Sequence, residues 1–221
     1  MDRRRLALAA LALAVMGKTA AQAPDRDAQL IRAAEAGDAV QVRTLLAQGA
    51  SVKTRDARGR TALLAATQGN RVEAARLLIE AGADVNAQDD IRNSAFLLAG
   101  ARGYLEILRM TLKAGADLKS TNRYGGTALI PACHYGHVAT VRELLATKIE
   151  VDHVNNLGWT ALLEAVTLGD GGAAHTEIVR LLVAAKANPN ITDRQGITPF
   201  QHAQGRGYRE IAAILGRAGG R

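Results

Sequence analysis

Residues 56–86 read DARGRTALLAATQGNRVEAARLLIEAGADVN, and this stretch decides the fold. It holds two short apolar patterns of helical period, at 61–67 and at 72–80, separated by a glycine-asparagine pair that tolerates left-handed backbone. Thr61 stands where a hydroxyl accepts a hydrogen bond from a helix N-terminal N–H, a contact worth about 1 kcal/mol. Gly82 follows the second pattern, where glycine commonly ends a helix. The stretch therefore predicts two antiparallel helices followed by a short extended segment.

The same unit recurs along the chain. Equivalent helix starts fall at Thr61, Ser94, Thr127, Thr160 and Thr198, so that the spacing is 33 residues three times and then 38. A degenerate first copy ends at residues 49–52. The six units lie at about 24–55, 56–88, 89–121, 122–154, 155–192 and 193–221. One unit cannot bury the apolar faces of both its helices, so neighbouring units must stack and the end units must carry polar outer faces.

The unit resembles the ankyrin repeat, whose pattern reads D-x-x-G-x-T-P-L-H-x-A, then a turn, then E-I-V-x-L-L-L and G-A-D-V-N. The matching residues in one unit are Asp56, Gly59, Thr61, Leu63, Glu73, Leu77, Leu78 and 82–86. The resemblance covers about residues 25–218. It implies an all-α repeat solenoid with a helix-turn-helix in each unit, β-hairpin fingers near the Asp-x-x-Gly turns, and a concave face that usually binds another protein.

The first residues are typical of an export signal. Arg3, Arg4 and Arg5 precede an uncharged run at 6–17, which is too short to cross about 30 Å of hydrocarbon as a helix. Small residues then permit cleavage after Ala21 or after Ala23, and both the general and the twin-arginine export routes stay open. We therefore expect a signal peptide at 1–23, a periplasmic or secreted mature protein, and no membrane span in the mature chain.

Charge and composition exclude several classes of protein. With 48% apolar and 22% charged residues the chain can bury a core, and its single cysteine excludes a disulfide scaffold. The net charge of +7 suggests a nucleic-acid partner at first. Removal of residues 1–23 takes away four positive charges and one negative charge, which lowers the net charge to +4. We therefore expect a monomer that binds no nucleic acid.

Three positions depart from the repeat pattern in ways that bear on the backbone. Arg92 replaces the finger-turn glycine, so either Arg92 takes a positive φ or the finger is reshaped. Lys148 and Lys186 replace the glycine that closes the second helix, which implies a similar backbone cost at both.

The fifth unit carries five extra residues within 169–176. With Asp170 and His175 this segment is either a metal or ligand loop or a tolerated surface insertion, and the second interpretation is favoured because such loops cost little entropy. Glu164 and His202 hold equivalent positions in successive repeats, so stacking is expected to bring them close. They are then an acid-base pair of a ligand binder or weak hydrolase, or they have a structural role. The structural role is favoured, either as a pair or with Glu164 accepting N–H groups of the glycine-rich loop.

Other chemistry is scarce. Cys133 occupies a position where the resemblance implies a buried alanine, so we interpret it as a packing residue. The remaining histidines lack the spacing of metal ligands, and no phosphate-binding loop or nucleophile elbow is present in the sequence. We therefore expect no enzyme activity, no cofactor and no metal.

The finger turns are the informative surface. Carried over position by position, they place an apolar file at Ile91, Tyr124, Leu157, Trp159 and Ile197, with basic residues at Arg58, Arg60, Arg123 and Arg194, while Tyr135 extends the patch from a first helix. Tryptophan, tyrosine and arginine dominate binding hot spots. The sequence thus predicts a non-catalytic scaffold that holds a protein partner with an acidic rim, whereas the opposing interpretation folds Trp159 onto its own repeat.

Overall fold

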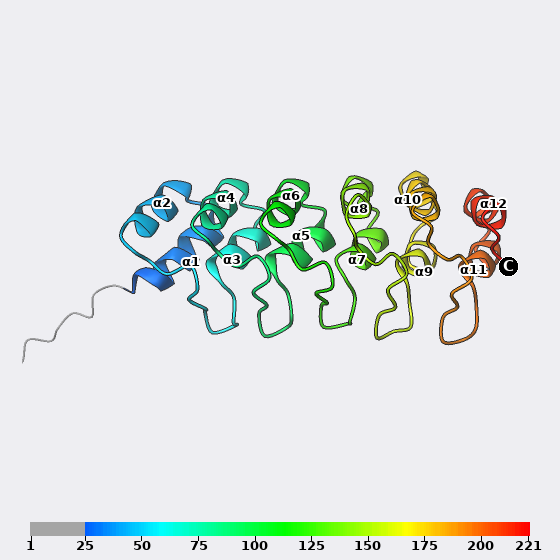
Figure 1. Ribbon diagram of the computed structural model, residues 1–221, viewed down its shortest axis with the longest axis horizontal. Helices are drawn as coiled ribbons and strands as arrows, with labels where there is room; N and C mark the ends of the chain where they lie inside the picture. Colours follow the sequence, from blue (N-terminus) through cyan, green and yellow to red (C-terminus); the bar gives the residue numbers. More distant parts are fainter. Residues whose placement is uncertain (1–24) are drawn as a thin grey trace, which may run out of the picture.

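The computed structural model describes residues 25–221, and these residues form pairs of antiparallel helices stacked in a row (Figure 1). The first helices of the pairs are α1 (Arg26–Ala36), α3 (Ala62–Gln68), α5 (Ala95–Arg102), α7 (Leu129–His134), α9 (Ala161–Thr167) and α11 (Pro199–Gly205). The second helices are α2 (Ala39–Ala47), α4 (Val72–Glu80), α6 (Leu105–Lys113), α8 (Val138–Leu145), α10 (Ala173–Ala184) and α12 (Arg209–Arg217). The predicted all-α solenoid is confirmed.

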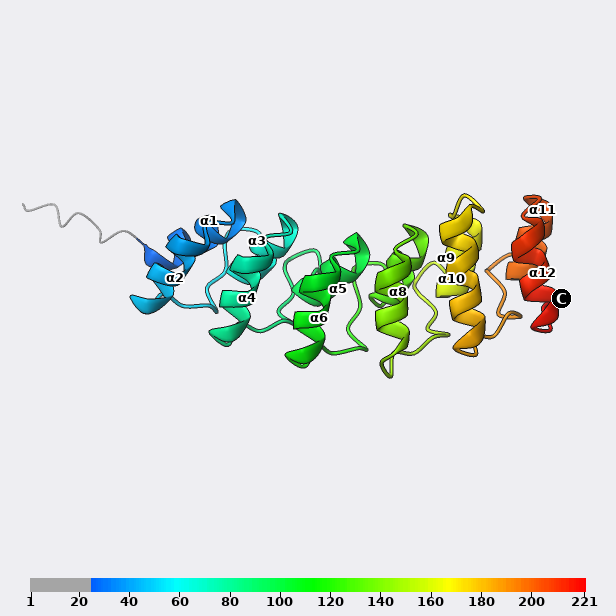
Figure 2. The ribbon, with the colours of Figure 1, turned by 90° about the horizontal axis from the view of Figure 1, so that it is seen from above.

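The solenoid has two helical layers and a row of loops. The second helices form one layer, the first helices lie beside them, and the finger loops project beyond the first helices (Figure 1). Seen from above, the helix pairs follow one another in a single line (Figure 2). The predicted signal peptide at 1–23 lies outside the described residues. Within residues 25–221 no helix has both the length and the apolar character needed to cross a bilayer.

The stack is held together by small side chains at a repeated position. Ala66, Ala99, Ala132 and Ala165, which are 33 residues apart, are all fully buried, and Ala203 continues the series. A methyl group at this position lets neighbouring first helices approach closely, and leucines and Phe96 fill the remaining space. Cys133 beside this series is fully buried, as the packing interpretation requires.

The finger loops of residues 25–221 are turns without the β-hairpin strands that the family resemblance implies. In the first complete finger the N–H of Asp56 donates to the carbonyl of Arg60 over 3.0 Å, and the N–H of Gly59 donates to the carbonyl of Asp56 over 2.9 Å. Two pairs of neighbouring fingers are joined by a single backbone bond, from the Asp90 N–H to the Arg58 carbonyl at 3.2 Å and from the Asn156 N–H to the Tyr124 carbonyl at 2.9 Å. Because each ladder has so few bonds, none of the fingers in residues 25–221 contains a strand.

Most of the predicted helix caps are confirmed. The hydroxyls of Thr61, Ser94, Thr160 and Thr198 each accept a backbone N–H at 3.2 Å. The prediction is wrong for Thr127, whose buried hydroxyl has no hydrogen-bond partner. The other four caps also accept the N–H four residues ahead on their carbonyl, but Pro131 has no N–H to offer Thr127. As a result α7 begins only at Leu129.

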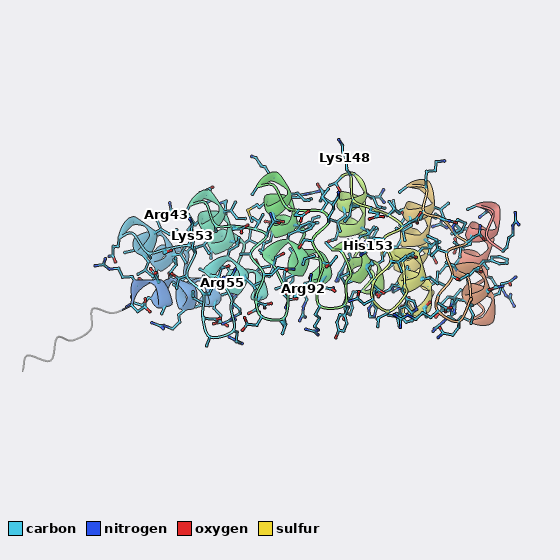
Figure 3. The ribbon with its side chains drawn as sticks, turned by 60° about the horizontal axis from the view of Figure 1, so that its bottom comes forward. Arg43, Lys53, Arg55, Arg92, Lys148 and His153 are labelled. Atoms are coloured by element: carbon cyan, nitrogen blue, oxygen red, sulfur yellow. The ribbon has the colours of Figure 1, made fainter. Side chains whose placement is uncertain are left out.

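A left-handed backbone conformation, which is unfavourable for residues other than glycine, occurs at two of the three positions where it was expected. Arg92 has φ 62° and Lys186 has φ 69°, so both non-glycine residues adopt the left-handed conformation. Lys148 does not have a positive φ. There the Thr147 hydroxyl donates to the Leu144 carbonyl and accepts the Ile149 N–H, which ends α8 without a left-handed residue. Figure 3 shows Arg92 on the finger side of the solenoid and Lys148 at the opposite edge.

Candidate functional site

The fingers share a turn that sets which side chains reach solvent. An aspartate or asparagine at the start of each finger uses one side-chain oxygen to accept the N–H groups of the residues two and four positions ahead, at 2.8–3.1 Å. These first residues are Asp56, Asp89, Asn122, Asn155 and Asp193. The residue two positions ahead lies at the exposed tip, and the residue four positions ahead lies where the chain returns to the helices.

This geometry explains which predicted binding residues are exposed. Ile91 and Tyr124 are each 50% exposed and Leu157 is 47% exposed, and all three occupy the tip position. Ile197, at the returning position, is 37% exposed and Tyr135 at the end of α7 is 60% exposed. The exposed arginines of the prediction are Arg58, Arg123 and Arg194.

Two predicted binding residues are less exposed than the tips, and one of them is buried. Arg60 is 3% exposed, and its guanidinium contacts Asp56 Oδ2 at 2.7 Å and Glu35 Oε1 at 2.9 Å. The hydrogen bond from Arg60 lowers the pKa of Glu35. Arg60 therefore ties the second repeat to the first and is unavailable to a partner. Trp159, at the same position of its own finger, is partly exposed.

A cavity of about 750 Å³ lies between the central fingers and the first helices of the third to fifth repeats. The finger side chains Arg123, Tyr124 and Leu157 line one side of it. The helices contribute Arg102, Pro131, His134, Tyr135, His137, Glu164 and Leu168. The Arg123 guanidinium lies 4.7 Å from the centre of the Tyr124 ring, and its Nη2 donates to the Tyr124 hydroxyl at 3.1 Å. The exposed tips thus continue into a concave, partly aromatic surface.

Glu164 of α9 is a buried carboxyl in the lining of this cavity. Only 6% of the residue is exposed, and its Oε1 accepts a hydrogen bond from Asn155 Nδ2 at 3.0 Å. Its Oε2 lies 3.6 Å from His134 Nδ1, beyond hydrogen-bond distance. Burial raises the pKa of Glu164 to about 7, although the Asn155 hydrogen bond acts in the opposite direction. The carboxyl is therefore partly ionised near neutral pH.

The groups around Glu164 supply little charge to balance it. Burial, together with the nearby His175, lowers the pKa of His134, so this imidazole is neutral at pH 7. His134 stacks on Tyr135 with 4.3 Å between the ring centres. Burial also raises the pKa of the Cys133 thiol far above its usual range, which keeps it protonated and unreactive.

The predicted insertion is a structural bridge. Residues 173–176 form the first turn of α10, which leaves only a short loop after α9. His175 is 8% exposed; its Nδ1 lies 2.8 Å from Asp170 Oδ1 and its Nε2 lies 2.9 Å from the His134 carbonyl. The Tyr208 hydroxyl donates to the Gly169 carbonyl at 3.0 Å. The segment therefore joins three repeats, with both His175 nitrogens already engaged.

Glu164 and His202 each bond a finger residue of their own repeat and form no hydrogen bond or ion pair with each other within residues 25–221. His202 Nε2 lies 2.7 Å from Asp193 Oδ2, at the base of the next finger, whereas Glu164 is held by Asn155. Each finger of these two repeats thus has its own helix partner. In the part of the chain that the structure describes, no three histidine, cysteine or acidic residues are grouped so as to hold a metal ion.

Sequence reasoning missed the contact between Glu164 and Asn155. Glu164 holds the position of Ala65, Leu98 and Pro131 in earlier repeats, and this difference was the available signal. Its partner was not apparent, because the spacing of repeats does not show how closely a finger approaches its helix.

Comparisons with known proteins agree with this geometry. A family model described as ankyrin repeats (3 copies) matches residues 8–89 and 96–193, and one described as ankyrin repeats (many copies) matches residues 172–215. The putative ankyrin repeat protein YahD of Escherichia coli K12 is 46% identical over 55 residues. That match covers 25% of this chain and 27% of YahD, so the chain aligns with about a quarter of that relative.

Solved structures match over most of the chain. An ankyrin repeat domain from Acinetobacter baumannii AYE is 58% identical with a TM-score of 0.85, covering 87% of this chain and 98% of that one. The ankyrin repeat protein EF0377 is 40% identical with a TM-score of 0.83, covering 86% and 98%. The ankyrin repeat domain of Bcl-3, a member of the IkappaB protein family, is 27% identical with a TM-score of 0.76, covering 87% and 86%.

Proposed function

Because the chain belongs to the ankyrin repeat family, we propose that it is a non-catalytic scaffold that binds a protein partner through its finger tips and the adjoining cavity. Ankyrin repeats generally mediate protein–protein interaction. The observation that carries the proposal is the file of exposed apolar tips at Ile91, Tyr124 and Leu157, one on each of three successive fingers. Apolar and aromatic side chains held at the solvent boundary by a fixed turn are typical of binding surfaces.

The charge around these tips indicates the chemistry of the partner. Arg58, Arg123 and Arg194 are exposed on the fingers. Arg58 lies 3.8 Å from a Glu35 oxygen and 4.0 Å from an Asp56 oxygen, whereas Arg123 and Arg194 form no ion pair within residues 25–221. A partner with acidic residues around an apolar centre fits this arrangement, because complementary charge at the rim speeds association. Binding by a single copy of the chain is sufficient for this function.

We place this function outside the cytoplasm. The support is the sequence of residues 1–23, with three arginines, an uncharged run and small residues near its end. Cell fractionation of the full chain, expressed in a bacterium with two membranes, tests this part of the proposal. Recovery in the periplasm or medium of a product shortened by about 23 residues agrees with it, and recovery of the uncut chain in the cytoplasm contradicts it.

The binding surface is tested by measuring affinity for a partner captured on the immobilised protein and then purified. Tyr124→Ala combined with Leu157→Ala is expected to weaken binding by more than 10-fold, a loss of about 1.4 kcal/mol or more, while the melting temperature stays nearly constant. Val40→Ala is the matched control, since Val40 is 78% exposed on α2. Equal affinity of the double variant and the control would refute the proposed surface.

A further inference from the structure

We propose that the cavity beside Glu164 receives a basic side chain of the protein partner, with its ammonium or guanidinium group against Glu164 Oε2. This inference rests on the proposed function and adds the chemistry of one contact to it. A basic residue flanked by acidic residues is the partner segment that fits, because the cavity has one carboxyl in its depth and Arg102 and Arg123 in its lining.

The first argument is that Glu164 has a free acceptor. Asn155 occupies Oε1, and Oε2 has no hydrogen bond within the described residues even though 94% of the residue is buried. In that same part of the chain, His134 is the sole basic group within 4 Å of the carboxyl, at 3.6 Å. A buried carboxylate without a cation is unfavourable, so an incoming cation gains more here than at an exposed acid.

The second argument is that the finger uses only one of the two oxygens of this carboxyl. The turn of the Asn155 finger also forms at Asp56, Asp89 and Asn122. Those fingers face Ala65, Leu98 and Pro131, at the position that Glu164 holds in its own repeat, and none of these three supplies a carboxyl. The Asn155 amide uses only Oε1 of Glu164, and in the next repeat His202 bonds Asp193 from the same helix position. The finger therefore accounts for Oε1, whereas Oε2 is left without a partner in the described residues and is available to a ligand.

The third argument is the shape and chemistry of the walls. Tyr124, Tyr135, Leu157 and Pro131 line the space in front of the carboxyl. Apolar walls suit the methylene stem of lysine or arginine, and aromatic rings attract the cation itself. The volume of about 750 Å³ exceeds that of one side chain, so the flanking residues of the partner also enter.

The other ionisable groups that face this space are accounted for. His134 is neutral at pH 7, and burial likewise lowers the pKa of His137. The Cys133 thiol is buried and protonated. Arg102 and Arg123 are exposed to solvent, and Arg123 donates to Tyr124. Their repulsion of a cation at Glu164 is therefore screened by water, whereas the attraction by the buried carboxylate is not.

The experiment is a titration of the full chain, followed by amide NMR, with n-butylammonium and n-butylguanidinium as probes at pH 8 and pH 5.5. The neutral n-butanol and the anion acetate serve as ligand controls. The expected result is saturable shifts at the amides of Asn155, Leu157 and Glu164, with affinity at least 10-fold weaker at pH 5.5. The two cationic probes also rank a lysine-like against an arginine-like side chain.

Variants separate the carboxyl from the walls. Glu164→Gln keeps the size and the Asn155 hydrogen bond and is expected to weaken cation binding at least 10-fold. Glu106→Gln, which removes an exposed acid from α6, is expected to bind as the natural chain does. No saturable binding, equal shifts with n-butanol, binding of acetate in place of the cations, or unchanged binding by Glu164→Gln would each overturn the inference.

The result is independent of the test of the proposed function. If the cations fail to bind while Tyr124→Ala with Leu157→Ala weakens the captured partner, the finger surface stands and the cation site is refuted. If the cations bind through Glu164 while the finger variants leave partner affinity unchanged, the cation site is supported and the finger surface is refuted.

Discussion

The raised pKa of Glu164 makes the stability of the protein depend on pH in a way that a single substitution removes. The unfolded chain holds this carboxyl at about 4.5 and the folded chain at about 7, because burial disfavours the charged form. The folded state therefore binds the proton more tightly. The stability from this group is fully present below pH 4.5 and is lost as the pH rises through 7. Glu164→Gln has no proton to lose and keeps its stability.

The magnitude follows from these two pKa values. Between pH 5 and pH 8 the ionisation of Glu164 lowers the free energy of unfolding of the natural chain by about 2.5 kcal/mol. Every other titrating group contributes equally to both proteins. The difference in unfolding free energy between Glu164→Gln and the natural chain is therefore expected to shift by about 2.5 kcal/mol in favour of the variant over this range.

Urea denaturation followed by circular dichroism at pH 5, 6, 7 and 8 measures this difference. Glu106→Gln is the matched control, because its exposed carboxyl is expected to give a difference that is constant with pH. A difference for Glu164→Gln that varies by less than about 0.5 kcal/mol would show that the carboxyl titrates as an ordinary glutamate. In that event the argument from burial is wrong.

Three further predictions concern stability and are read from thermal or urea unfolding. Arg60→Ala is expected to destabilise the protein by about 2 kcal/mol, because it leaves the carboxylates of Asp56 and Glu35 without their partner. Arg58→Ala, at an exposed tip, is expected to change stability by less than about 0.5 kcal/mol. Equal effects of the two substitutions would contradict the burial of Arg60. Lys186→Gly is expected to stabilise by about 1 kcal/mol, because glycine adopts φ 69° without strain, and a destabilised variant would count against the strain. Thr127→Val is expected to stabilise the protein by about 1 kcal/mol, because it removes a buried hydroxyl that has no hydrogen-bond partner. Thr160→Val is expected to destabilise the protein by about 1 kcal/mol, because it removes a helix cap. Stability changes of the same sign in both variants would refute the different roles assigned to the two hydroxyls.

The repeat was predictable because the same helix starts, turns and apolar positions recur at a regular spacing in the sequence. The spacing of helix starts and the small residue at each first-helix contact specify how units stack, and the structure has both. The predicted cap at Thr127 is absent because Pro131, four residues later, has no backbone N–H to donate. That signal was present in the sequence, and the pattern of the other repeats obscured it. Lys148 likewise differs from Lys186 because the preceding threonine supplies a second way to end the helix.

The candidate site was predictable only in part. Tyr124, Leu157 and Ile91 lie on exposed tips as predicted, but Arg60 and Trp159 do not. The finger turn bonds the residues two and four positions ahead, and the sequence alone does not show how exposed the second of these is: Arg60 is buried, Trp159 is partly exposed and Ile197 is exposed. The contact between Glu164 and Asn155 depends on how closely a finger approaches α9, which is a tertiary distance and not a property of the repeat pattern.

The central claim is that the tips of the central fingers touch a protein partner. It is tested most directly by photo-crosslinking in cells of the organism that makes the protein, with a benzophenone amino acid in place of Leu157 and, in a control, in place of Val40. We predict a discrete crosslinked product of higher mass from position 157 and none from position 40. The absence of any product from position 157, or the same product from both positions, would contradict the account.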